Sequence, residues 1–253
     1  GVAPSQGVQK GMVVNIRGAR DAIRASLAEA RRYTGRGVSW AYVGVSGTNT
    51  SSMFTTGSLK EPKASGALSK EDLDAMLQAS YPRLGRDQEV LHVLPRTYKI
   101  DGLRGVRNPV GLQASEAEVE SHVITANAAA LIKLRRAVEK SGIGVRRFVM
   151  GPLAAGEACL TEDEREVGVA LIDLGAASTE LALFRDGKTR LLASVPWGGA
   201  AVTNDLVRGL SIPFAEAERA KERHGAAFAP LVDPHETVEV PGPAPGSTRQ
   251  IPR

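Results

Sequence analysis

Hydrophobic residues recur at every second position in several parts of the chain, which predicts strands. The segment 38–47, VSWAYVGVSG, alternates in this way, and so does the segment 116–127, EAEVESHVITAN, whose alternate residues would share one face. Residues 89–102 also predict a strand, with a bend at Pro95 because proline cannot donate a backbone hydrogen bond. The strand segments are spread along the chain and are not gathered in one part of it.

Helical spacing of hydrophobic residues predicts helices between these strands. Residues 18–33 have this spacing, and so has the segment that follows the strand 116–127. A helix over 69–80 has a start signal of its own, because Ser69 and Asp72 stand at the spacing of a capping box. The chain therefore predicts a mixture of strands and helices.

Three strands in succession are predicted for 168–195. The runs VGVALIDLG, STELALF and TRLLASV are separated by short turns, and the second turn, Arg185 to Lys188, contains an Asp-Gly pair typical of a tight hairpin. We expect a three-stranded antiparallel sheet, and a helix after Gly198 and Gly199. The final PGPAPGSTRQIPR predicts no further element, and both ends of the chain are typical of a fragment.

Composition limits the classes of function. The chain has 253 residues, 42% hydrophobic, with a net charge of +4, which suits one or two folded domains. Aromatic residues make up only 4% and no long basic run occurs, so nucleic acid is not an expected partner. The single Cys159 excludes a disulfide framework and fits a reducing compartment. No apolar run approaches the roughly 20 residues of a membrane-spanning helix.

The turn after the first of the three strands, in LIDLGAASTELALF, has the features of a phosphate-binding loop. A strand follows it, whereas P-loop and dinucleotide sites have a helix there, so neither of those sites is expected. Backbone N–H groups of such a turn can face an anion, and Asp173 at the strand end could hold a metal-bound water. A plain hairpin with a chance aspartate explains the turn equally well.

Longer motifs resemble the FtsA family of bacterial cell-division proteins. They include LHVLPRTYKIDG, NPVGL, GPLAAGEACLTEDEREVGVALIDLGAAST and VPWGGAAVTNDL, in the order that this family has them. The resemblance implies an α/β fold of actin-like, RNase H-like subdomains with an FtsA-type inserted α+β subdomain. The resemblance implies four divisions. Residues 1–55 with 141–167 would form a first actin-like subdomain, and residues 56–140 would form an inserted subdomain. Residues 168–213 would form a second actin-like subdomain with the phosphate loop, and residues 214–253 would be the start of a fourth.

The resemblance also implies a site for ATP and Mg²⁺. Asp173 would hold Mg²⁺ through water, and the loop would contact phosphate through Gly175, Ala176, Ala177, Ser178 and Thr179. Family members usually have glycine at both alanine positions. Alanine would cost roughly 1 kcal/mol if the turn required a positive φ.

Two further pairs of residues belong to this expected site. Gly198 and Gly199 would either let the backbone approach a phosphate or only form a sharp turn. Glu218 and Lys221, three apart on a predicted helix, would contact the ribose and adenine, or form an ordinary surface ion pair. Gly151 stands where strongly hydrolytic actin relatives have a glutamate, so we expect at most a slow ATPase and no catalytic residue.

By this resemblance the protein is a scaffold that binds ATP, polymerises and tethers FtsZ filaments to the cytoplasmic membrane. Its partners would be the C-terminal tail of FtsZ, bound mostly by a subdomain outside this chain, and further copies of itself. It would be cytoplasmic, peripheral on the inner face of the membrane, and attached by a C-terminal helix absent from this sequence. The alternatives are a pilus assembly platform of the PilM kind and, with less support, a small-molecule kinase or phosphatase of the same superfamily.

Overall fold

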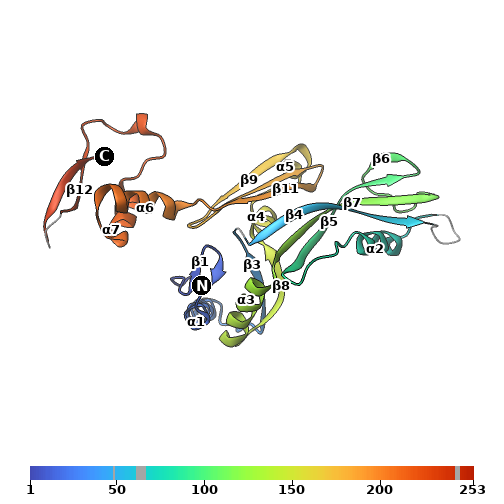
Figure 1. The fold of residues 1–253 in the computed structure, drawn as a ribbon, viewed down its shortest axis with the longest axis horizontal. Coiled ribbons are helices and arrows are strands. Elements are labelled where there is room, and N and C mark those ends of the chain that lie inside the picture. The colour runs from blue at the N-terminus through green and yellow to red at the C-terminus, as the bar shows by residue number, and fades with distance from the viewer. Residues whose placement is uncertain (48, 61–66, 243–245) are drawn as a thin grey trace. The chain divides into compact units, whose positions relative to one another are not determined.

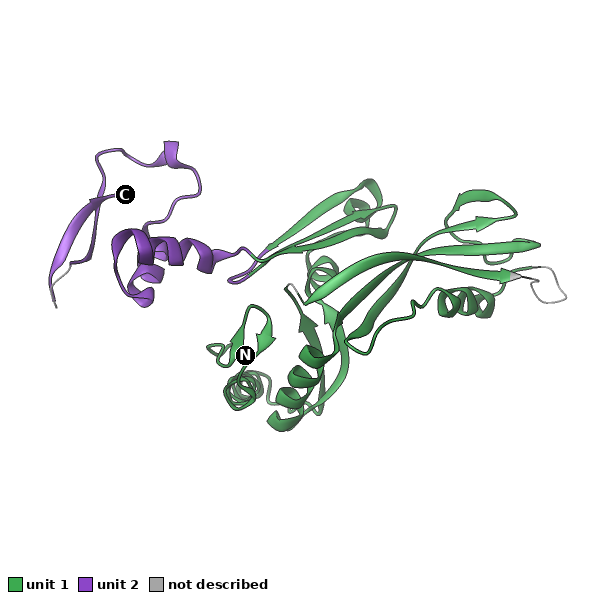
Figure 2. Cartoon of the chain, in the orientation of Figure 1, with its two compact units in different colours: residues 1–173, 178–196 green, residues 174–177, 197–253 purple. Residues whose placement is uncertain are grey.

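The structure is a computed structural model that describes residues 1–47, 49–60, 67–242 and 246–253. The chain divides into two compact units (Figure 2). Unit 1 comprises residues 1–173 and 178–196, and unit 2 comprises residues 174–177 and 197–253.

The first part of unit 1 is a pair of parallel strands packed against helices (Figure 1). Its elements are β1 (Val8–Gln9), β2 (Met12–Val13), α1 (Ile16–Thr34), β3 (Trp40–Val45), α3 (Ala128–Ser141) and β8 (Gly144–Met150). Strands β3 and β8 pair in parallel. Helix α1 starts at Asn15, whose side chain accepts hydrogen bonds from two backbone N–H groups. Leu131 and Phe148 lie in a buried cluster that joins α3 to the strands.

A four-stranded antiparallel sheet forms the second part of unit 1. Its strands are β4 (Thr50–Lys60), β5 (Gln88–Ile100), β6 (Leu103–Val106) and β7 (Glu116–Asn127), in the order β4-β7-β5-β6. Helix α2 (Lys70–Ala79) packs on one face, where Met76, Tyr98 and Val119 are buried. The predicted capping box of Ser69 and Asp72 is confirmed.

The bend predicted at Pro95 is also confirmed, because the register of β5 against β7 shifts between Pro95 and Thr97. Helix α3, which the sequence groups with 56–140, packs against α1, β2 and β8 as well as against β7. Strand β4 begins earlier than residue 56, at Thr50. The part of unit 1 that consists of the four-stranded sheet and α2 therefore ends at Asn127, just before α3 begins.

The third part of unit 1 is the predicted three-stranded sheet. Helices α4 (Gly151–Cys159) and α5 (Glu162–Val167) precede β9 (Val169–Leu174), β10 (Thr179–Arg185) and β11 (Lys188–Val195), in the order β11-β10-β9. Asp186 and Gly187 turn the antiparallel β10–β11 hairpin with φ angles of 55° and 67°. Glycine and aspartate suit this left-handed region. Strand β5 belongs to the other sheet, as predicted.

Unit 2 consists of two helices and a strand pair. Its elements are α6 (Gly199–Leu210), α7 (Phe214–His224), the 3-10 turn η1 (Ala229–Leu231), β12 (Thr237–Pro241) and β13 (Thr248–Pro252). Strands β12 and β13 pair antiparallel. The prediction that no element follows in the Pro/Gly-rich end is therefore wrong. Strand β13 forms because each of its residues has a partner in β12, a hairpin pairing that local composition does not reveal.

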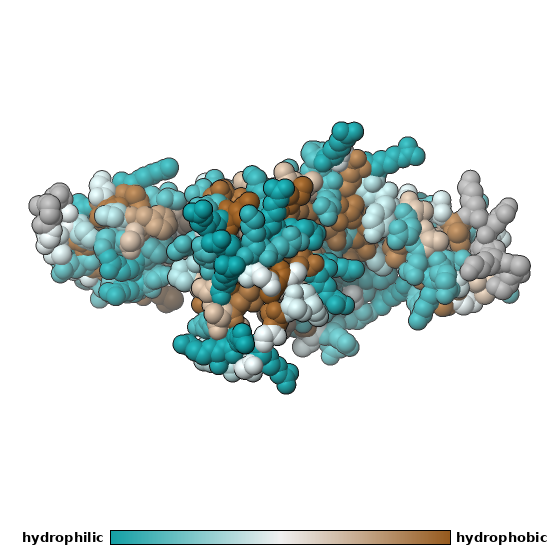
Figure 3. Space-filling model, turned by 90° about the horizontal axis from the view of Figure 1, so that it is seen from below, coloured by the Kyte–Doolittle hydropathy of each residue, from teal (hydrophilic) through white to brown (hydrophobic). Residues whose placement is uncertain are grey.

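The surface carries some large hydrophobic residues among many hydrophilic ones (Figure 3). Trp40 and Tyr42 on β3 are among the exposed ones, and Arg146 of β8 lies 4.5 Å from the ring centre of Trp40. Within the described ranges, no helix is both long enough and apolar enough to cross a membrane.

Candidate functional site

The loop between β9 and β10 has ordinary backbone geometry. Asp173 lies near the end of β9 with an exposed side chain, and Ser178 and Thr179 at the start of β10 are half-buried. None of Gly175, Ala176 and Ala177 has a positive φ angle. The condition under which the two alanines would strain this turn is therefore not met, because the turn does not enter the region that alanine avoids.

The loop backbone contacts the start of α6 within unit 2. The N–H of Gly199 donates to the Gly175 carbonyl at 3.0 Å, and the N–H of Ala200 donates to the Ala176 carbonyl at 2.8 Å. A Cβ atom on Gly198 would overlap the Gly175 carbonyl oxygen and lie 2.8 Å from that of Ala176. Glycine at 198 thus permits a close approach of two backbone segments, and contact of Gly198 and Gly199 with a phosphate stays a prediction.

Glu218 and Lys221 form more than a surface ion pair. The Lys221 ammonium lies 2.7 Å from Glu218 Oε1 and donates to the Thr203 hydroxyl at 2.9 Å and to the Gly199 carbonyl at 3.2 Å. Thr203 is fully buried and also bonds to Glu218. Bonds from Lys221 and Thr203 lower the pKa of the Glu218 carboxyl. The pair on α7 is therefore tied to the first turns of α6, where the phosphate loop also docks.

A largely apolar cavity of about 410 Å³ adjoins Lys221. It lies between α6, α7, β12 and β13, and its apolar lining includes Val202, Leu206, Val238, Val240 and Ile251. Such a cavity, with the cationic side chains of Lys221 and Arg253 in its lining, can take a flat, mostly apolar ring. Local sequence patterns do not reveal this cavity, because they do not predict β13, which lines one side of it.

A buried carboxylate in unit 1 is the functional group that sequence reasoning missed. Glu180 of β10 is only 2% exposed, and the backbone N–H of Gly47, just beyond β3, donates to its Oε1. Its Oε2 lies 3.1 Å from where a Cβ atom on Gly151 would stand. Alternation along β10 could have revealed it, since Glu180 shares the buried face with Ala182 and Phe184.

The environment of Glu180 favours its neutral form. Burial raises the pKa of the Glu180 carboxyl, and the negative charge of Asp173 raises it further. Hydrogen bonds from Gly47 and Ser46 act in the opposite direction. The pKa of Glu180 is raised on balance. The carboxylate is buried near Asp173, the predicted magnesium residue, and does not face solvent.

The residues present fit a magnesium ion held mainly through water. Mg²⁺ keeps several waters and is usually bound by one or two carboxylates together with phosphate oxygens. Asp173 supplies an exposed carboxylate at the loop. Within the described ranges, no group of three or more His, Cys, Asp or Glu side chains is placed to hold a metal directly. The donor set therefore suits a metal that arrives with phosphate.

Comparison with known proteins gives matches over most of the chain. The sequence model described as Cell division protein FtsA matches residues 170–253, and the SHS2 domain inserted in FTSA matches residues 47–125. The FtsA protein of Pseudomonas aeruginosa is 34% identical over 255 residues, which cover all of this chain and 60% of the relative. That of Bacillus subtilis is 33% identical over 241 residues, which cover 95% of this chain and 55% of the relative.

A solved structure, the PilM–PilN type IV pilus biogenesis complex, has a TM-score of 0.62 at 20% identity, covering 88% of this chain and 60% of that chain. At this identity the likeness shows the fold alone, which is actin-like, and the matched SHS2 domain accounts for the inserted part. The sequence matches narrow the class. The chain belongs to the FtsA family of cell-division proteins, and it spans about 60% of the length of the first curated relative it matches. The predicted fold class and family are confirmed.

Proposed function

We propose that this chain is the nucleotide-binding part of an actin-like cell-division scaffold that binds ATP with Mg²⁺. One observation carries the proposal: in unit 2 the phosphate loop, the start of α6 and the Glu218–Lys221 pair form one continuous set of contacts. Gly175 bonds to Gly199, and Lys221 bonds to the carbonyl of the same Gly199. The phosphate loop and the Glu218–Lys221 pair, which would contact the nucleoside, would thus both be held by the start of α6.

Each part of the nucleotide has candidate partners in this chain. Ser178 and Thr179 offer hydroxyl groups, and the loop from Gly175 to Ala177 offers backbone N–H groups to phosphate oxygens. Mg²⁺, held through water by Asp173, would neutralise part of the phosphate charge when it is bound. Lys221 and Glu218 would contact the ribose and adenine, and the apolar cavity next to Lys221 has room for the base.

Turnover of ATP should be slow. Position 151 holds no side chain, and the nearest carboxylate, Glu180, is buried and hydrogen-bonded to Gly47. A general base must reach the attacking water directly or through one other water. Glu180 is poorly placed for that role because its carboxylate is buried and faces the protein interior.

The cellular role follows from the family. We propose that the protein polymerises, binds the C-terminal tail of FtsZ and lies on the inner face of the cytoplasmic membrane, attached by a C-terminal helix. Regions 1–55 with 141–167, and 168–213, would be actin-like subdomains, and residues from 214 onward would begin a fourth. For the inserted subdomain we propose about residues 50–127, because α3 packs on α1. The FtsA relatives, at 31–34% identity over most of the chain, favour this role over that of PilM, the neighbour at 20%.

Two binding measurements on the protein in its natural full length test this proposal. Calorimetry should detect saturable binding of Mg·ATP, weaker without Mg²⁺. A peptide of the FtsZ C-terminal tail should bind, whereas a peptide from the pilus protein PilN should not. Failure to bind ATP under both conditions would contradict the nucleotide proposal. Binding of the PilN peptide alone would contradict the cell-division role.

A further inference from the structure

A second polar pocket lies in unit 1 at the far end of the β10–β11 hairpin. Its volume is about 470 Å³, and it is lined by Arg96, Thr97, Gly105, Val106, Arg107, Glu120, Asp186, Lys188 and Arg190. Thr179 pairs with Val195 at one end of the hairpin, and Arg185 pairs with Lys188 at the other. The pocket is therefore separated from the phosphate loop by the length of the hairpin.

The three arginines of the pocket are already paired with carboxylates. Arg96 pairs with Glu120, and Arg190 pairs with Asp186. Arg107 pairs with both Asp186 and Glu166 of α5. Lys188 forms no ion pair with any described residue. The lining thus holds four cationic side chains and two carboxylates, and Glu166 from outside the lining neutralises a third cation through Arg107, so one unit of positive charge is left at the pocket.

Lys188 is the group that carries this surplus. It is partly buried, its ammonium donates to the Arg107 carbonyl at 3.4 Å, and it lies 5.5 Å from the ring centre of Tyr98. Burial lowers the pKa of the Lys188 ammonium, and the charges of Arg190 and Arg107 lower it further. An anion placed beside Lys188 would relieve this repulsion where screening by water is reduced.

We propose that this pocket binds a carboxylate group. A single negative charge matches the single surplus positive charge, whereas a phosphate dianion would add a second negative charge beside Glu120 and Asp186. Lys188 would provide the ion pair, and the outer N–H groups of Arg96 and Arg190 would donate to the second oxygen.

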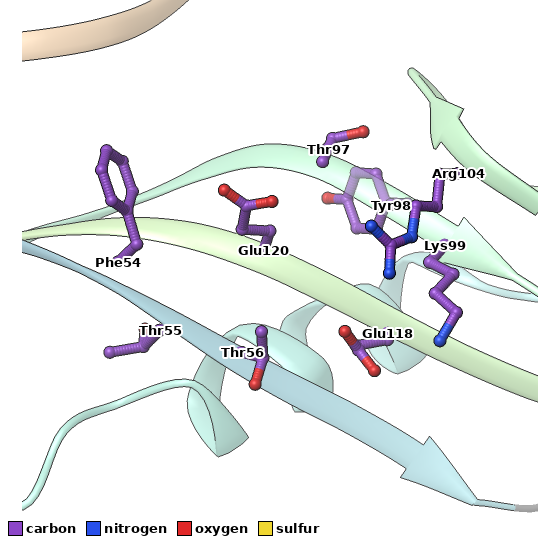
Figure 4. A pocket seen from close by; sticks show the side chains of 9 residues that line it. All are labelled: Phe54, Thr55, Thr56, Thr97, Tyr98, Lys99, Arg104, Glu118 and Glu120. Carbon is purple, nitrogen blue, oxygen red and sulfur yellow. The ribbon is translucent and has the colours of Figure 1, made fainter.

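The neighbouring surface favours an acidic side chain of a polypeptide as the source of this carboxylate. A second cavity of about 420 Å³ shares Thr97 and Glu120 with the pocket and extends over the open face of the four-stranded sheet. In Figure 4, Phe54 lies at one end of this cavity, and Lys99 and Arg104 lie at the other. The polypeptide that continues from the bound acidic side chain could thus contact the ring of Phe54 and the polar groups of Lys99 and Arg104.

Nuclear magnetic resonance on the protein in its natural full length tests the proposal. N-acetyl-glutamate N-methylamide, titrated at low ionic strength, should give saturable shifts at the amides of Val106, Arg107, Gly187 and Lys188. Its glutamine analogue should bind at least about ten-fold more weakly, a difference of ~1.4 kcal/mol. Equal binding of the two compounds, or tighter binding of inorganic phosphate, would overturn the proposal. Glutarate binding without binding of the glutamate compound would overturn the polypeptide source and leave a free acid as the ligand.

A variant checks the role of Lys188. Lys188→Gln should lower the affinity for the glutamate compound at least about ten-fold, and Arg185→Gln, which removes an exposed charge on the same hairpin, should not. Unchanged affinity in Lys188→Gln would overturn the proposal. If that variant fails to fold, the comparison of the glutamate and glutamine compounds on the unmodified chain decides alone. No nucleotide is present in these measurements, so their outcome is independent of ATP binding.

Discussion

Glu180 fills the space that a side chain on Gly151 would need, with its Oε2 3.1 Å from the position of a Cβ atom on residue 151. The Ser46 hydroxyl lies closer still to that position, at 2.8 Å. Hydrolytic actin relatives have a glutamate at this place in the sequence. In this chain a glutamate from a different strand occupies the same region, so a large side chain at 151 would have to displace it.

A side chain at 151 should therefore destabilise the protein without restoring catalysis. Gly151→Glu should lower the free energy of unfolding by about 1–3 kcal/mol, the usual cost of overpacking, and should not raise phosphate release. Urea denaturation and a phosphate-release assay measure the two effects. Gly44→Ala is the matched control, because a Cβ atom there meets nothing within 4 Å. A stable Gly151→Glu protein with faster phosphate release would contradict this account.

The alanines of the phosphate loop should prove well tolerated. Because Ala176 and Ala177 have ordinary φ angles, replacing both with glycine should leave the affinity for Mg·ATP within about two-fold of the parent value. The same change should lower the free energy of unfolding by about 0.4–1 kcal/mol per site, since glycine gives the unfolded chain more freedom. Calorimetry and thermal denaturation measure the two effects. A ten-fold gain in affinity would show that the alanines do strain the loop.

Thr203 should stabilise unit 2 through its two charged partners. Thr203→Val keeps the shape but removes the hydroxyl that contacts Glu218 and Lys221, so it should cost about 1–3 kcal/mol of unfolding free energy. Thr237→Val, at an exposed position of β12, is the matched control and should change little. Equal stabilities of the two variants, measured by urea denaturation, would contradict a structural role for this contact.

Acid should destabilise the protein through His92. The backbone N–H of Met150 donates to His92 Nε2 at 3.0 Å, so that nitrogen must be unprotonated. Burial and the charge of Arg147 lower the pKa of His92 from its usual 6.5. A histidine with a lowered pKa contributes stability that is present above pH 6.5 and is lost as the pH falls through the folded-state pKa.

Urea denaturation between pH 8 and pH 5 measures this loss. His92→Gln removes the titrating group, so the decrease in unfolding free energy over this range should be smaller than in the parent. His235→Gln, at an exposed position, should leave the decrease unchanged. Identical pH dependence in the parent and His92→Gln would contradict the assignment.

The sequence predicted what depends on local pattern. Period-two alternation and the Asp-Gly turn were enough for the β9–β11 sheet, and Ser69 with Asp72 was enough for the start of α2. The motifs around Asp173 were enough for the family. These features depend on residues that are close together in the chain, so a single sequence is enough to predict them.

The remainder depends on residues far apart in the chain. Glu180 meets Gly47 and Gly151 only after β10 is placed beside the ends of β3 and β8, and the packing of α3 on α1 joins segments over 90 residues apart. The backbone angles of Ala176 and Ala177 follow from the docking of the loop on α6, so composition alone could not give them.

Magnesium-dependent ATP binding by Asp173→Ala is the most direct test of the central claim, that the β9–β10 turn is a phosphate loop. Calorimetry on the protein in its natural full length would compare the parent, Asp173→Ala and the control Asp205→Ala, with and without Mg²⁺. We predict that Mg²⁺ strengthens ATP binding in the parent and in the control but not in Asp173→Ala. If Asp173→Ala binds Mg·ATP as tightly as the parent does, the turn is only a hairpin and the account is wrong.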